Sequence, residues 1–247
     1  MTNEWKLTEE KYRKLLAFIG YGDFKNADFI VFGNEEGTGG YGIEENVEAR
    51  IGYYGKDENG EYVDCINPNN PLEGFWDNSA SNKIARYLED NGRENVEDIQ
   101  YVKGSFLSTI ARICLALEDE AANSEFWFKT FTEHPDARDH IQLHILNNLF
   151  KSNSRIKTAL SDWRPLPRST ENKWPQEYHQ IHPELKNNPY INAFNKVVTL
   201  PNEYRNDFSD FSQDVFKRLT ILKNTFTASN SRIVLSLGGV NGMKRMP

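Results

Sequence analysis

Hydrophobic residues recur at helical spacing in several parts of the chain, and these segments predict its helices. Near the N-terminus Thr8 is a capping residue, the apolar positions after it lie three or four residues apart, and Gly20 and Gly22 end the pattern. The same spacing predicts four further helices, at Glu44–Ile51, Ser79–Tyr87, Phe106–Leu117 and Ser212–Phe226.

Continuous apolar runs predict the strands. The run Ala27–Phe32 has the composition of a strand buried on both faces of a parallel sheet. Ile141–Phe150 is a second plausible buried strand, although its length also permits the end of a helix, and Arg232–Leu237 is the third strand. Residues 151–190 read as a long irregular stretch. Strands that alternate with helices and long connections indicate a single α/β domain over residues 1–247 with a mainly parallel sheet.

Small and polar residues stand at the end of each predicted strand, in the sequences GNEEG, NNLF and GGVNG. Ligands of parallel sheets bind at the carboxyl ends of the strands, so these ends predict a site. GNEEG is neither a phosphate-binding P-loop nor a dinucleotide fingerprint. It offers Asn34, Glu35 and Glu36 as acceptors that could activate a water or stabilise a developing cation, and the alternative is a solvated acidic turn.

The distribution of charge along the chain points to one segment that differs from the rest. A net charge of −7 over 247 residues argues against binding nucleic acid by bulk charge. Residues 151–174 reverse the balance, with six basic residues against two acidic ones and with Trp163 and Trp174 between them. This composition predicts a surface that contacts phosphates and stacks bases, with Arg164, Arg168 and Lys173 as DNA-binding residues. An ordinary loop held by tryptophans and prolines is the alternative.

The sequence gives little support for a metal site, a redox centre or a membrane-spanning segment. Two cysteines cannot form a disulfide framework or a four-cysteine cluster, and we expect no cofactor. The spacing of His140 with His144, and of His179 with His182, would suit a metal on a helix, but surface or capping histidines are the simpler interpretation. Without a signal-peptide pattern or an apolar run of membrane length, we expect a cytoplasmic protein with no membrane partner.

The three strand ends together resemble the uracil-DNA glycosylase superfamily. GNEEG after ADFIVF is similar to the first motif of that family, ILNNLF resembles its second strand with a base-reading asparagine, and RIVLSLGG is similar to its third. The resemblance implies a three-layer α/β/α sandwich with a short, mainly parallel central sheet. It also implies DNA as partner and metal-free hydrolysis of the N-glycosidic bond of a flipped base.

The resemblance assigns roles residue by residue. Asn34 and Glu35 would act on water, Asn147 would read the base, and Gly33 and Gly37 would bound the first motif. The remaining assignment is a ring that stacks on the base, for which the candidates are Tyr41 and Phe75.

The chain also departs from the family. Glu36 replaces the usual proline, the insertion between the first two motifs is long, and the fourth strand and late loop of the family find no counterpart before Pro247. Two functions therefore stay open: a DNA N-glycosylase with impaired activity, and a non-enzymatic nucleic-acid or protein-binding module that keeps the fold. A small-molecule hydrolase that uses Glu35 or Glu36 has no support beyond the two carboxylates.

Overall fold

The computed structural model describes residues 5–38, 42–51, 105–119, 124–130, 136–150, 154–195 and 210–236. The predicted helix Ser79–Tyr87 and the residues Tyr41, Cys65 and Phe75 lie outside these ranges. Within them, no helix combines the length and the apolar character needed to cross a membrane.

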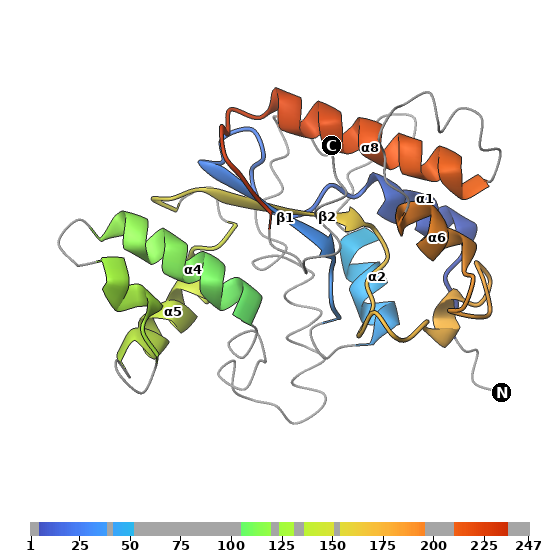
Figure 1. Cartoon of the computed structure of the whole chain (residues 1–247), viewed down its shortest axis with the longest axis horizontal. Coiled ribbons are helices and arrows are strands. Elements are labelled where there is room, and N and C mark those ends of the chain that lie inside the picture. Colours follow the sequence, from blue (N-terminus) through green and yellow to red (C-terminus); the bar gives the residue numbers. More distant parts are fainter. Residues whose placement is uncertain are drawn as a thin grey trace.

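A parallel sheet of three strands, in the order β2-β1-β3, forms the centre of the described structure (Figure 1). The strands are β1 (Phe29–Glu35), β2 (Thr158–Arg164) and β3 (Val234–Ser236), and β1 pairs in parallel with both neighbours. In this register Gly33 lies opposite Asp162 and Glu35 opposite Arg164. Residues that lie opposite one another in a sheet project to the same face, so the carboxyl end of the β1–β2 pair carries these four residues on one face.

Helices cover both faces of the sheet. On one face α4 (Ser105–Glu118) and α5 (Asp136–Asn147) share an apolar cluster with Phe29, Val31 and Leu160. On the other, α8 (Asp210–Ala228) packs against Ile30 and Ala159, and Figure 1 shows α8 lying on the opposite side of the strands from α4 and α5. The prediction of an α/β fold with a small parallel sheet is confirmed.

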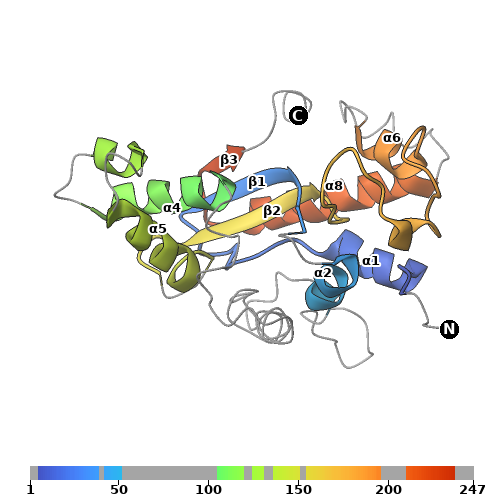
Figure 2. The same ribbon diagram turned by 90° about the horizontal axis from the view of Figure 1, so that it is seen from below.

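The remaining elements gather near the carboxyl end of the sheet. They are α1 (Glu9–Ala17), α2 (Ile43–Ile51) and α6 (Pro189–Asn195), and they share a second apolar cluster that includes Phe32 and Trp163. Figure 2 shows α1, α2 and α6 at one end of the molecule and α4 and α5 at the other. Within the described ranges, Ser124–Phe128 forms the 3₁₀ helix η3 and Gln176–Tyr178 forms the 3₁₀ helix η4.

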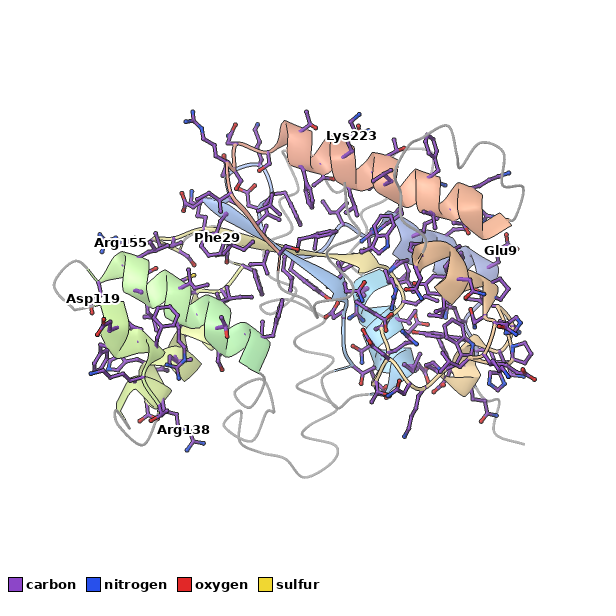
Figure 3. The ribbon with its side chains drawn as sticks, viewed as in Figure 1. Glu9, Phe29, Asp119, Arg138, Arg155 and Lys223 are labelled. Atoms are coloured by element: carbon purple, nitrogen blue, oxygen red, sulfur yellow. The ribbon has the colours of Figure 1, made fainter. Side chains whose placement is uncertain are left out.

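The helices α1, α2, α4 and α8 form where the helical spacing predicts them. In α1 the Thr8 side chain accepts a hydrogen bond from the Lys11 amide at 3.3 Å, and Tyr12, Leu15 and Leu16 form the buried stripe. In Figure 3 the side chains of Glu9, Arg138 and Lys223 lie at the periphery and Phe29 lies at the centre. The sorting of polar and apolar positions therefore follows the helical and strand periods.

The prediction of a strand at Ile141–Phe150 is wrong, because most of this segment belongs to α5. Ile141, Ile145 and Leu149 are buried at intervals of four residues, whereas Leu143 is 56 % exposed. A strand buried on both faces would not leave Leu143 in solvent, and the interval of four is that of a helix face.

The second strand instead lies in the stretch interpreted as irregular, at Thr158–Arg164. Its sequence TALSDWR mixes polar and apolar residues and precedes the proline-containing PLPR, so it lacks the apolar run that marked the other strands. The edge of β2 away from β1 is covered, because Leu160 exchanges two backbone hydrogen bonds of 2.8 Å with Tyr21.

Candidate functional site

Gly33 and Asp162 approach each other closely where β1 and β2 end. A Cβ atom on Gly33 would lie 2.0 Å from Oδ1 of Asp162, so the carboxyl group of Asp162 occupies the space that any side chain at position 33 would need. Glycine therefore leaves room for this close approach, whereas a Cβ at position 33 would require the Asp162 carboxyl group to move. The result is a carboxyl group that rests against the bare backbone of β1.

The surroundings of Asp162 favour its neutral form. The residue keeps partial exposure to solvent, but its carboxyl group lies among many protein atoms, and this burial raises the pKa to about 7 from an ordinary value of 3.8. The Glu36 and Glu35 carboxylates also raise the pKa, while the Arg218 and Arg50 guanidinium groups lower it. Near neutral pH, Asp162 is thus present in both protonation states.

Two arginines enclose Glu35, the last residue of β1. Arg168 donates to both of its carboxylate oxygens, at 2.6 and 2.8 Å, and Arg164 donates to Oε2 at 3.0 Å. The Glu35 side chain is only 5 % exposed. Charge-assisted hydrogen bonds of this forked kind fix the orientation of a carboxylate and occupy its oxygens, so the arrangement is that of a structural bridge rather than a free general base.

Glu36 belongs to a second cluster beside the first. Its Oε2 atom accepts from Arg50 of α2, at 3.1 Å from Nε, and from the Tyr21 hydroxyl. Although burial disfavours the charged guanidinium, the adjacent Glu36 carboxylate raises the pKa of Arg50. Burial, and then Glu36, raises the pKa of Tyr21 well above its usual value, so this phenol stays a hydrogen-bond donor at neutral pH.

The site residues expected from the sequence are only partly brought together. Gly33, Glu35, Arg164 and Arg168 meet at the carboxyl end of β1 and β2, and Asn34 lies beside them with its amide 3.4 Å from Glu171. Gly37 follows in the exposed part of the loop, where a Cβ would meet nothing within 4 Å.

Two of the expected roles do not fit the structure. Asn147 is exposed at the end of α5, and Phe150, just after it, bonds Thr158 at the amino end of β2, roughly 20 Å of strand from the carboxyl end. Arg164 and Arg168 are 8 % and 3 % exposed and bind Glu35, so they do not form a phosphate-contacting surface. Lys173 is exposed.

The two histidines of α5 lie in different surroundings. No group of three or more His, Cys, Asp or Glu residues within the described ranges is placed to hold a metal ion. His144 is buried and faces Glu118 of α4, with Nδ1 and Oε2 3.8 Å apart, whereas His140 is exposed. Burial raises the pKa of the Cys114 thiol to about 12, which leaves it protonated and unreactive.

Sequence reasoning missed Asp162, Arg50 and Arg218 as members of this site. Asp162 interrupts an otherwise buried segment between Ser161 and Trp163, and such an interruption is the one signal that the sequence offered. Arg50 and Arg218 each lie on an amphipathic helix, where an arginine is ordinarily assigned to the solvent face.

Comparison with known proteins adds no relative: no family model, no curated protein and no solved structure matches the chain.

Proposed function

We propose that the chain is a uracil-DNA-glycosylase-like protein that takes up a base flipped out of DNA and hydrolyses its N-glycosidic bond at the carboxyl end of β1 and β2. The observation that carries the proposal is the Asp162 carboxyl, held against Gly33 with a pKa of about 7. In its neutral form this group offers one O–H donor beside one acceptor oxygen. The ring edge of uracil offers the complementary pair, a carbonyl oxygen beside an N–H.

The same contact would assist the reaction. When the bond between the sugar C1′ and the base nitrogen breaks, its electron pair leaves with the base, and the Asp162 O–H stabilises the charge that develops on the base carbonyl. Water adds its oxygen to C1′, and the proton that it loses neutralises the departing base anion. Asn34 lies at the same edge and would orient that water, while Glu35 keeps the structural role that its two arginines give it.

The resemblance of the strand ends supports this choice of reaction. GNEEG contains the last three residues of β1, and the segment RIVLSLGG contains β3, so two of the three motifs fall on neighbouring parallel strands. The base-reading role that the resemblance gave to Asn147 passes in this proposal to Asp162, which occupies the end of the strand beside β1.

A glycosylase assay on single- and double-stranded DNA containing uracil tests the proposal at about pH 6 and about pH 8. We expect abasic product that decreases as Asp162 ionises. Asp162→Asn keeps a donor beside an acceptor and should stay active without that decrease, and Asp162→Ala should be inactive. Absence of product from either DNA at both pH values, with folded protein, would overturn the enzymatic proposal.

The ion pairs of Glu35 favour a second candidate, a module that binds a base without releasing it. The carboxylate expected to act on water is engaged by Arg164 and Arg168. Fluorescence anisotropy with a uracil-containing oligonucleotide separates the two candidates. Binding that Asp162→Ala abolishes, without abasic product, identifies the module, and lack of binding at low salt excludes it.

A further inference from the structure

Arg218 of α8 reaches the back of the Asp162 peptide. Its side chain is among the largest that are fully buried, with 1 % exposure of the residue. The guanidinium donates to four backbone carbonyls, those of Leu16 and Phe18 where α1 ends and those of Asp162 and Trp163 on β2. The bond to the Asp162 oxygen is 2.5 Å long.

These contacts explain why a charge can be buried at this point. The last carbonyls of a helix have no partner within the helix and carry the negative end of its dipole, so the end of α1 attracts a cation. Along β2, successive carbonyls alternate in direction, and the Leu160 oxygen already faces outward to Tyr21. The Asp162 oxygen faces the same edge, and Arg218 satisfies it.

The Asp162 carboxyl lies among charges from several elements. Glu35 and Glu36 face it from the end of β1 and raise its pKa, while Arg50 of α2 and Arg218 of α8 lower it. Tyr21, on the segment beside β2, stays protonated there because burial raises its pKa well above the usual value. Arg218 therefore combines a bond to the Asp162 backbone with an electrostatic effect on its side chain.

We propose that Arg218 is a positioning residue for Asp162, because it holds the Asp162 carbonyl from behind β2 and so fixes the direction in which the carboxyl group projects over Gly33. The importance of this position for base recognition rests on the function proposed above. The hydrogen bonds of the Arg218 guanidinium fix the position of the Asp162 backbone. Its positive charge limits how far the pKa of Asp162 rises.

Carbon-13 NMR titration of the Asp162 carboxyl tests the electrostatic part of the proposal without any substrate, and uracil-DNA affinity tests the geometric part. Arg218→Gln removes the charge and should raise the titration midpoint by roughly one pH unit. Arg218→Lys keeps the charge but cannot span the carbonyls, so the midpoint should stay near that of the parent while uracil-DNA affinity falls about tenfold. Arg112→Lys is the matched control, since Arg112 also donates to backbone carbonyls, of Trp127 and Lys129, far from Asp162.

An unchanged midpoint in Arg218→Gln would overturn the proposal. If the Arg218 variants do not fold, nitrogen-15 NMR of the parent guanidinium replaces them: the Arg218 signals should shift with the midpoint of Asp162 and should cease to do so in Asp162→Asn. Guanidinium signals whose chemical shifts do not change as Asp162 titrates would also overturn the proposal. If the titrations behave as expected but no base is bound or released, the proposed function fails and the positioning role stands.

Discussion

Gly33 and Asp162 show how a single missing side chain can define a site. The absence of a Cβ at position 33 lets the Asp162 carboxyl lie against the strand, and this burial is the first cause of its raised pKa. A buried carboxyl that titrates near neutrality is more typical of functional groups than of structural ones. Glu35, which looked more reactive in the sequence, is held by Arg164 and Arg168 instead.

The titration of Asp162 should be visible in the pH dependence of stability. Its folded-state pKa of about 7 lies above the ordinary value of 3.8, so the folded protein binds a proton that the unfolded chain releases. The resulting stabilisation is complete below about pH 4 and is lost as the pH rises through about 7. Asp162→Asn should remove this loss, so that its free energy of unfolding at about pH 8 exceeds that of the parent by about 4 kcal/mol.

Urea unfolding of Asp162→Asn and the parent from about pH 4 to about pH 8 measures this effect. Parallel stability curves for the two proteins would contradict a raised pKa. Asp139→Asn serves as control, since Asp139 is exposed on α5 and its substitution should leave the slope of the parent unchanged.

At the scale of elements, α4 and α5 pack through a core that contains one poorly satisfied polar group. His144 of α5 is 4 % exposed, and among the described residues its Nε2 atom has no hydrogen-bond partner. Glu118 of α4 lies near Nδ1 and also accepts the Ile156 amide at 3.3 Å. Burial lowers the pKa of His144, and the Glu118 carboxylate opposes this effect only in part.

Acid should therefore weaken the α4–α5 packing. Because the folded protein binds the His144 proton less readily than the unfolded chain does, stability should fall as the pH drops below about 6.5. His144→Phe should flatten this part of the stability curve. Thermal unfolding at several pH values measures it, with His140→Phe on the exposed side of the same helix as control. Equal acid sensitivity of the two variants would exclude His144 as the cause.

At the scale of the whole molecule, the Glu35 bridge joins distant parts of the chain. Arg168 also donates to the Glu171 carbonyl at 3.1 Å, and its amide bonds the Glu36 carbonyl at 3.1 Å, so the loop after β2 is fixed to the loop after β1. Residues 129 and 133 positions apart in sequence are thereby held in contact. The bridge shapes the edge of the sheet at which the proposed site lies.

Glu35→Gln should leave two buried guanidinium groups without their counter-charge. We expect the free energy of unfolding to fall by about 3 kcal/mol. When one partner of a buried ion pair is removed, the desolvation cost of the remaining buried charge is no longer compensated. Glu171→Gln, at an exposed position of the same cluster, should change it by less than about 1 kcal/mol. A fully stable Glu35→Gln that has lost base release would show instead that Glu35 is catalytic.

Local periodicity in the sequence was sufficient to predict α1, α2, α4 and α8, the strands β1 and β3, and the α/β class. Each of these elements has an apolar stripe or run that its own residues display. It was also sufficient to place GNEEG at the end of a strand.

Only the tertiary structure decided that Thr158–Arg164 is a strand, that Ile145 belongs to a helix, and that Asp162 is the unusual carboxyl. β2 can contain polar residues because β1 accommodates them. Glu35 of β1 binds Arg164, and Gly33 of β1 leaves space for the Asp162 carboxyl group. Pairing between strands and the pKa of a side chain depend on groups brought close by folding, and a pattern along the chain does not contain those distances.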